Sequence, residues 1–341
     1  MKYNIIQRVI RMGPDEFRKK CKGIIPVLFC PYAKDRKSVD LEALRKNTQF
    51  LVNFANKGNK DVVIITNGST AEFYANSIEE QKSVIKTVID TVDGAIPTIV
   101  GVSQAGTKET IKMAKYAEAV GADCVMVVTP YYHTPFKEGL YRHFKAIAES
   151  INIGIMVYNN VAVSAANIDP KLTARLSKID NIVALKDNTP IAKEWFLKTI
   201  YVKPEDIALC IGTAEVNYVS AASFGFMYKA FVTSLGNYAP QLSYFVYEAV
   251  EKERDFIKAH ELLREKIAPI ISLIDTFSAN RSKISILPSG YGGAYIYQSV
   301  GKAAMDLIEE LYGGPCRLPM EELTKAEKNE LETVLKEIGL I

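Results

Sequence analysis

A lysine that ends a run of apolar residues is the side chain in this sequence best placed to do chemistry. Lys186 follows Ile-Val-Ala-Leu in segment 182–187, which is typical of a buried strand. Burial disfavours the charged ammonium and lowers the pKa of a lysine, and the neutral amine can then attack the carbonyl carbon of a ketone. The alternative is a structural lysine at a strand end that reaches solvent or pairs with Asp187.

Tyrosines end two other apolar runs. Tyr158 ends the run that precedes the one of Lys186, and a phenol there can carry protons to and from a carbinolamine. Tyr131 and Tyr132 end the run that begins at Cys124. Each tyrosine has the alternative interpretation of an amphipathic residue with a buried ring and a solvated hydroxyl.

Small polar residues follow two further runs. Gly68, Ser69 and Thr70 offer backbone N–H groups and two hydroxyls at a strand-to-helix turn, and such turns bind carboxylates or phosphates. An ordinary turn that leads into a helix cap is the alternative. Thr213 and Glu215 follow another run and are further candidates for substrate binding.

The histidines and cysteines do not form a metal-binding pattern. The three histidines are scattered and lack the glutamate of a zinc-binding helix. The five cysteines form no CxxC pair, which indicates reduced, buried thiols. We therefore expect no metal ion, and nothing in the sequence calls for a cofactor.

Eight short apolar runs would position these residues. Each is nearly continuous in apolar character, as parallel strands covered on both faces are. They span 24–30, 61–68, 98–103, 124–132, 153–159, 182–187, 207–212 and 229–234. Helical patterns lie between them, at 39–58, 77–92, 107–122 and 137–151, and Ser77 followed by Glu80 is a capping-box signature.

Strand followed by helix, repeated eight times, predicts an α/β fold, a (β/α)8 TIM barrel, whose functional residues sit at the C-terminal ends of the strands. A doubly wound open sheet is the alternative, but no dinucleotide fingerprint follows the first strand. Helical patterns at 241–312 and 321–338 predict a C-terminal helical extension. We expect an N-terminal extension at 1–22, the barrel at 23–250 and the helical region at 251–341.

The bulk composition fits a cytoplasmic globular protein. The chain has 341 residues, 48% of them hydrophobic, and a net charge of +3. This charge is too small to indicate nucleic-acid binding. No segment has the length of a signal peptide core or of a membrane helix.

The candidate residues, taken together, resemble a known family of Schiff-base class I aldolases, the dihydrodipicolinate synthase / N-acetylneuraminate lyase family. The resemblance covers residues 23–340, and segment 129–150 is especially similar. The motifs that carry it are Gly68-Ser69-Thr70-x-Glu72, Thr129-Pro130-Tyr131-Tyr132, Tyr158-Asn159 and Lys186.

The resemblance implies a role for each of these residues. Lys186 would form a Schiff base with pyruvate or a related 2-oxo acid, and Tyr158 would be the acid/base tyrosine. Ser69 and Thr70 would bind the 2-oxo acid carboxylate, with Ser69 also relaying protons. Tyr132 would reach across a dimer contact into the neighbour's site, so the family implies a homo-oligomer, a dimer or a dimer of dimers.

Three positions depart from the family pattern. Ala71 replaces a glycine and Val161 replaces a proline. At Val163 the dihydrodipicolinate synthases carry an arginine that binds the carboxylate of aspartate semialdehyde. The loss of a bidentate carboxylate ligand argues against that reaction.

Several functions therefore stay open. An N-acetylneuraminate-lyase-like aldolase is favoured by the Gly68-Ser69-Thr70 motif, the missing arginine and Glu215, although Ala214 replaces an aspartate. A 5-dehydro-4-deoxyglucarate dehydratase is the runner-up, on Glu72-Phe73-Tyr74 and the loop 313–319. Dihydrodipicolinate synthase and a silent barrel that binds a 2-oxo acid are less favoured.

Overall fold

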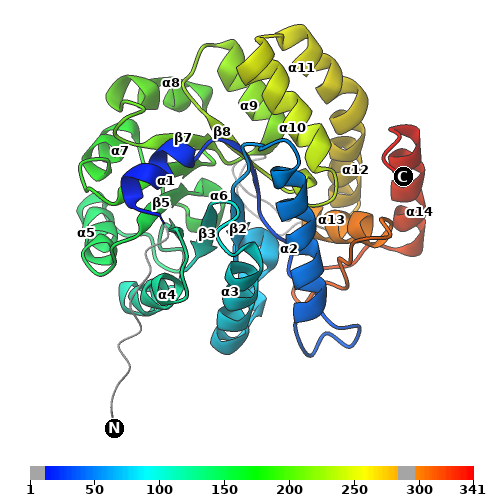
Figure 1. Cartoon of the computed structure of the whole chain (residues 1–341), viewed down its shortest axis with the longest axis horizontal. Coiled ribbons are helices and arrows are strands. Elements are labelled where there is room, and N and C mark those ends of the chain that lie inside the picture. The colour runs from blue at the N-terminus through cyan, green and yellow to red at the C-terminus, as the bar shows by residue number, and fades with distance from the viewer. Residues whose placement is uncertain (1–11, 283–295) are drawn as a thin grey trace.

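The computed structural model describes residues 12–282 and 296–341 of the chain. Eight parallel strands form one sheet, in which each strand from the second to the eighth pairs with its neighbour in the chain and the first pairs with the eighth. Parallel bridges from Ile24 to Val62 and from Val27 to Ile65 join the first strand to the second and close the barrel. The predicted (β/α)8 TIM barrel is confirmed, and Figure 1 shows helices surrounding it.

The eight predicted strands all form, each wholly buried. They are β1 (Gly23–Pro26), β2 (Ile64–Thr66), β3 (Thr98–Gly101), β4 (Cys124–Val128), β5 (Gly154–Asn159), β6 (Ile182–Asp187), β7 (Ala208–Ile211) and β8 (Ala230–Thr233). Several apolar runs extend beyond the ladder, as at Leu28 and Phe29, which are buried after β1 ends. An apolar run indicates that its residues are buried. Residues at the buried end of a loop can produce such a run as well as a strand can.

Helices follow the strands as the periodicity predicts. They are α2 (Leu41–Asn56), α3 (Ile78–Val92), α4 (Thr107–Ala119), α5 (Lys137–Ala148), α6 (Val161–Ser164), α7 (Pro170–Leu176), α8 (Ala192–Tyr201), α9 (Ala214–Ser223) and α10 (Pro240–Glu248). Ser77 and Glu80 form the predicted capping box at the start of α3. Each side chain accepts a hydrogen bond from the backbone N–H of the other residue. These bonds satisfy N–H groups that have no partner within the first turn of the helix.

The barrel interior forms a core of its own, separate from the layer between strands and helices. The N-terminal helix α1 (Pro14–Lys20) packs against β5 and β6 and lies across the strands in Figure 1. Its Phe17 and the following Cys21 are buried in the interior core. This helix therefore closes the end of the barrel where the strands begin.

The C-terminal helices pack beside the barrel, as expected. They are α11 (Phe256–Leu262), α12 (Ala268–Ala279), α13 (Tyr297–Asp306) and α14 (Lys325–Glu337), with π-helical turns at Ala249–Glu253 and Leu263–Ile267. The division of the chain at residues 22 and 250 stays a prediction. Among the residues described here, no helix combines the length and apolarity needed to cross a membrane.

Candidate active site

A cavity of about 680 Å³ opens at the C-terminal ends of the strands. Of the candidate residues that the sequence singled out, six line it: Ser69, Thr70, Tyr131, Tyr158, Lys186 and Thr213. They come from the ends of strands or loops that are far apart in sequence, so the barrel itself brings them together. Gly68, Tyr132 and Glu215 are not among the lining residues.

Lys186 is deeply buried at the end of β6, with 4% of its surface exposed. Its Nζ lies 3.9 Å from the centroid of the Tyr158 ring. Burial lowers the pKa of Lys186 to about 7, and a smaller interaction with Cys210 acts in the opposite direction. A substantial fraction of the amine is therefore neutral near pH 7.

Asp187 is not the partner of Lys186. Its carboxylate lies 2.8 Å from Nζ of Lys198, and both side chains are fully buried. Its other oxygen accepts a hydrogen bond from the Thr189 hydroxyl. The alternative that Lys186 pairs with the next residue is therefore wrong, because this acid is occupied on the other side of the strand.

Tyr158 sits beside Lys186 because β5 and β6 pair these two residues in register. Burial raises the pKa of Tyr158 well above its usual value, while hydrogen bonds with Asn160 and Ser69 lower it. The amide of Asn160 donates to the phenol oxygen at 2.8 Å. Near neutral pH the phenol is therefore protonated and can donate a proton or pass one on.

The Ser69–Thr70 turn forms one wall of the cavity. Ser69–Ala71 is a single 3-10 turn, followed by Glu72 in the left-handed region at φ 51°. The Thr70 hydroxyl lies 3.4 Å from the Tyr297 hydroxyl. Gly68 lies behind this wall, since a Cβ there would come 2.8 Å from Cγ1 of Val27.

Gly212 lies where the backbone packs closely against the side chains of Asn188 and Lys186. A Cβ at this position would lie 1.9 Å from Oδ1 of Asn188 and 3.0 Å from Cγ of Lys186. Any side chain would therefore displace Asn188 and press on Lys186. The sequence shows this glycine at a strand end but not the close approach that requires it.

Glu215 has a structural position rather than the expected place in the substrate site. Its carboxylate accepts hydrogen bonds at 2.6 Å from both Thr233 and Ser243, and it is buried away from the cavity lining. Burial raises the pKa of Glu215 while these hydrogen bonds lower it. Helix α9 begins at Ala214 and turns the next side chain toward β8, so the predicted contact with substrate is not supported.

Tyr132 points away from the cavity of its own chain. It is 78% exposed, whereas its neighbour Tyr131 lines the cavity. Within the described part of the chain, its ring makes an edge-to-face contact with His133, with the ring centroids 5.0 Å apart. The predicted role in a neighbouring copy's site needs this exposure and stays a prediction.

The C-terminal region contributes residues that sequence reasoning missed. Arg281, Tyr297, Gln298 and Glu321 all line the cavity. No local motif marks them, because they are defined only by how α12, α13 and the loop after it pack over the strand ends. Asn160 and Asn188 were also missed, although their places just after β5 and β6 were a usable signal.

A buried amine of lowered pKa beside a phenol, at the C-terminal end of a (β/α)8 barrel, defines a Schiff-base-forming lyase of the class I aldolase type. The model of the dihydrodipicolinate synthetase family matches residues 20–338. The chain belongs to this family, as its motifs indicated.

Curated relatives and solved structures agree with this assignment. The 4-hydroxy-tetrahydrodipicolinate synthase of Archaeoglobus fulgidus is 31% identical over 321 residues, which is 94% of this chain and 99% of the relative. The protein of the same name from Methanocaldococcus jannaschii is 32% identical, with 94% and 99% covered. The chloride-inhibited dihydrodipicolinate synthase of Acinetobacter baumannii, complexed with pyruvate, has a TM-score of 0.76 at 26% identity, covering 94% of this chain and 99% of that one.

Proposed function

We propose that Lys186 forms a Schiff base with pyruvate or a related 2-oxo acid, and that the enzyme makes or cleaves the adjacent carbon–carbon bond. The observation that carries this proposal is the burial of Lys186, with its pKa lowered to about 7, beside Tyr158. The neutral amine attacks the ketone carbon to give a carbinolamine, which loses water and becomes an imine. The protonated imine accepts the electron pair released when a proton or an aldehyde leaves the next carbon.

The neighbouring side chains supply the proton transfers and the binding of the carboxylate. Tyr158 protonates the carbinolamine hydroxyl as it leaves, and Ser69, hydrogen-bonded to that phenol, replaces the proton. The hydroxyls of Ser69 and Thr70, at the cavity wall, donate to the carboxylate of the 2-oxo acid.

Borohydride trapping tests this proposal. The protein is incubated with pyruvate and sodium borohydride, and the mass and the modified peptide are determined. We expect a stable reduced adduct on Lys186, and no adduct in Lys186→Met. An adduct on another lysine contradicts the proposed role of Lys186, and the absence of any adduct favours the silent barrel.

The cavity favours a hydroxylated aldehyde as the second substrate, as in an N-acetylneuraminate-lyase-like reaction. Val163 lines the cavity where an arginine would bind a second carboxylate. Among residues 12–282 and 296–341, Oδ1 of Asn188 and Oε1 of Gln298 are buried without a hydrogen-bond partner, and both residues line the cavity. Acceptors of this kind call for O–H donors, and burying them unpaired costs about 1–3 kcal/mol each.

Arg281 does not replace the missing arginine. Its guanidinium donates to both oxygens of Glu327, at 2.7 and 2.9 Å, and to Glu321 at 3.1 Å. A further bond goes to the carbonyl oxygen of Phe277 at 2.6 Å. Its charge and donors are thus already used, which leaves little for a substrate carboxylate.

A second candidate is 4-hydroxy-tetrahydrodipicolinate synthase. It is favoured by the relatives of that name, which match over nearly the whole chain. Parallel assays separate the candidates: release of pyruvate from N-acetylneuraminate, condensation of pyruvate with aspartate semialdehyde, and release of CO2 from 5-dehydro-4-deoxyglucarate. We expect the first to have the highest kcat/KM. A higher value for aspartate semialdehyde assigns the synthase reaction, and CO2 release assigns the dehydratase.

Gln298 provides a matched test of the second substrate. Gln298→Leu removes the unpaired acceptor at similar volume. We expect kcat/KM for a hydroxylated substrate to fall about tenfold, since a lost hydrogen bond costs about 1 kcal/mol or more, while trapping with pyruvate is unchanged. An unchanged kcat/KM contradicts hydroxyl recognition at this residue.

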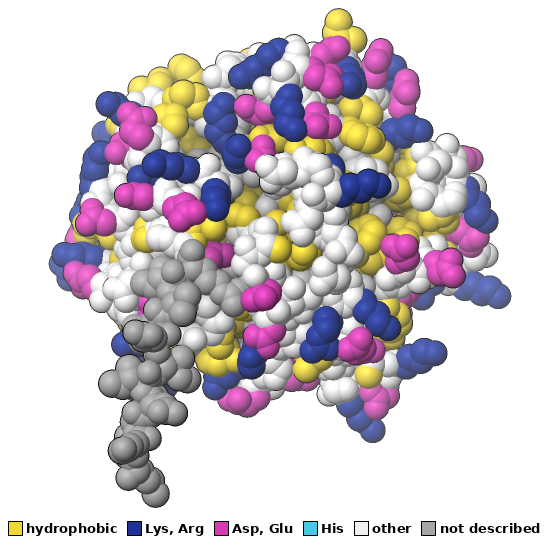
Figure 2. Space-filling view, in the orientation of Figure 1, with side chains coloured by type: hydrophobic (Ala, Val, Ile, Leu, Met, Phe, Trp, Pro, Cys, Tyr) yellow, Lys and Arg dark blue, Asp and Glu magenta, His cyan; other side chains and the backbone are white. Residues whose placement is uncertain are grey.

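We also propose that the chain forms a homo-oligomer. Tyr132 and Phe136 are exposed on the loop after β4, and a second apolar surface lies on α8, α9 and the turn after them. This α8–α9 surface consists of Phe196, Ile200, Tyr201, Phe224 and Met227. In Figure 2 hydrophobic side chains gather over α8, among interspersed positive and negative charges. Light scattering during gel filtration tests the proposal, with a dimer or tetramer expected and a monomer contradicting it.

A further inference from the structure

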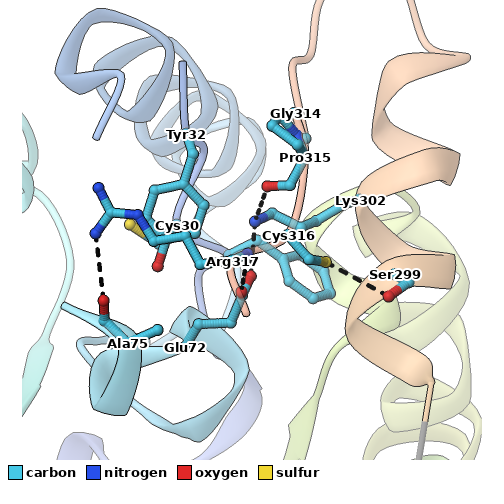
Figure 3. Close-up of polar contacts among 12 residues, drawn as sticks. Cys30, Tyr32, Glu72, Ala75, Ser299, Lys302, Gly314, Pro315, Cys316 and Arg317 are labelled. Carbon is cyan, nitrogen blue, oxygen red and sulfur yellow. Dashed lines mark hydrogen bonds and ion pairs between the residues drawn. The ribbon is translucent and has the colours of Figure 1, made fainter. Parts of the chain in front are cut away.

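A buried ion pair connects the C-terminal region to the turn that carries Ser69 and Thr70. Nζ of Lys302, on α13, lies 2.7 Å from Oε1 of Glu72, and both side chains are at most 1% exposed. The other carboxylate oxygen, Oε2, accepts the backbone N–H of Arg317 at 2.8 Å. Figure 3 shows Glu72 reaching up to these two partners, which come from a segment far away in sequence.

The ammonium of Lys302 is itself fixed on a second side. It donates to the carbonyl oxygen of Pro315 at 2.8 Å. The segment passes α13 closely at this point, since a Cβ on Gly313 would lie 2.1 Å from the carbonyl oxygen of Lys302. Lys302 therefore links three elements: α13, the segment that follows it and the turn after β2.

Arg317 completes the cluster and balances its charge. Its guanidinium forms a bidentate pair with Glu80, at 2.9 and 2.6 Å. The Tyr32 ring lies near both cations, 4.4 Å from Nζ of Lys302 and 4.3 Å from Cζ of Arg317. Two carboxylates thus face two cations around one aromatic ring, which contributes cation–π attraction.

Glu72 is connected directly to the residues of the cavity wall. Its backbone N–H donates to the carbonyl oxygen of Ser69 at 3.0 Å, and its left-handed φ of 51° ends the turn. The same helix that carries Lys302 also places Tyr297 3.4 Å from the Thr70 hydroxyl. Helix α13 therefore meets this turn at two points, one at the cavity and one beneath it.

Stability alone is a weak reason for such an ion pair. Desolvation of two charges offsets most of their attraction, and apolar replacements often leave stability unchanged or improved. What a buried pair does supply is a defined geometry, because any displacement leaves a charge unpaired. Here the fixed element is the wall that would receive the substrate carboxylate.

We propose that Lys302 is a positioning residue, which acts through Glu72 to fix the Ser69–Thr70 turn for binding of the 2-oxo acid carboxylate. This inference rests on the proposed Schiff-base function. It predicts weaker binding of pyruvate when the pair is removed, with Lys186 still able to react once pyruvate is saturating.

The double variant Glu72→Gln/Lys302→Met tests this without leaving a charge buried and unpaired. The rate of borohydride trapping is measured against pyruvate concentration, and the adduct is quantified at saturation. We expect the half-saturating pyruvate concentration to rise about tenfold or more, as a small misplacement of a binding group costs up to about 100-fold. The saturated adduct on Lys186 should remain stoichiometric.

A stability-matched control separates positioning from loss of fold. Phe144→Leu lies in the buried face of α5, so it should lower the melting temperature and leave the pyruvate dependence unchanged. If the double variant is not recovered folded, Glu72→Gln/Lys302→Gln, which also leaves no charge buried and unpaired, is compared in the same way. A folded variant with the wild-type pyruvate dependence overturns the inference, whereas a wild type without any adduct overturns the proposed function itself.

Discussion

The burial of Lys186 sets a pH dependence for Schiff-base formation. With a pKa of about 7, the reactive neutral amine is roughly 10% of the total at pH 6 and roughly 90% at pH 8. The initial rate of borohydride trapping with pyruvate should therefore rise about tenfold across this range and then level off. A rate that keeps rising to pH 10 would indicate an ordinary, solvated lysine.

The same burial makes Lys186 a cost to the folded state. In the folded state its pKa is about 7, below the ordinary 10.5. Between these two pH values the unfolded chain binds more protons than the folded chain, so the free energy of unfolding increases with pH. The penalty is largest below pH 7 and disappears as pH approaches 10.5. Lys186→Met should stabilise the protein by about 1–3 kcal/mol at pH 6, and by less at pH 10.

Urea unfolding at the two pH values measures this difference. A Lys186→Met variant that is less stable than the wild type at pH 6 would show that the lysine is not desolvated. The conservative Lys186→Arg variant is a useful comparison, because its charge cannot be lost in the same way and it should be the least stable of the three.

At the residue scale, the sequence predicted some site positions and missed others. Lys186 and Tyr158 were singled out because each lies at the end of a predicted strand, and both line the cavity. The sequence does not show that the carboxylate of Glu215 accepts hydrogen bonds from the hydroxyls of Thr233 and Ser243. Gln298 carries no local signal, since its burial depends on how α13 packs.

At the scale of elements, β7 and β6 must approach closely where the reactive amine lies. In Gly212→Ala the new methyl group would overlap Oδ1 of Asn188, 1.9 Å away, and crowd Cγ of Lys186 at 3.0 Å. We expect the trapping rate with pyruvate to fall at least about tenfold, since a displaced reacting group loses its favourable orientation.

Gly225→Ala is the matched control for this substitution. Gly225 follows α9 and has a left-handed φ of 77° with no atom near its would-be Cβ. It should therefore cost about 1 kcal/mol of stability through backbone strain and leave trapping unaffected. Equal trapping rates in the two variants would show that β7 does not constrain Lys186.

The elements themselves were largely predictable, but their ends were not. All eight strands follow from continuous apolar runs, and the capping box fixed the start of α3. The predicted 124–132 strand overshoots β4, which ends at Val128, because the chain then leaves the ladder and Tyr131 lines the cavity. A loop that lines a functional site can therefore end a strand before the apolar run in the sequence ends.

For the whole molecule, the α8–α9 surface bears on assembly. Phe224 is 72% exposed and Ile200 60% exposed, which is unusual for large apolar side chains of an isolated chain. The double variant Ile200→Glu/Phe224→Glu should lower the oligomeric mass measured by light scattering, because two charges would be buried unpaired in the contact. Lys193→Gln/Lys203→Gln, at exposed positions near the two ends of α8, changes the net charge by the same amount and should keep the wild-type mass.

The whole-molecule architecture was predictable up to the point where repetition ends. The regular alternation of strand and helix patterns, together with their number, eight, predicts a closed barrel. No such repeat governs residues beyond 250, so the sequence predicted helices there but not that Tyr297, Gln298 and Glu321 complete the cavity. Their placement depends on contacts such as Lys302 with Glu72, which span most of the chain.

Because residues as late as Glu321 line the cavity, synthesis on the ribosome separates the making of the barrel from the making of its pocket. All eight strands have been translated by Thr233, yet Glu321, the last residue of the cavity wall, follows 88 codons later. A nascent chain that is halted between these two points contains Lys186 but not the residues that complete the cavity wall. Metabolites that contain ketones therefore meet a completed pocket only once translation has almost finished.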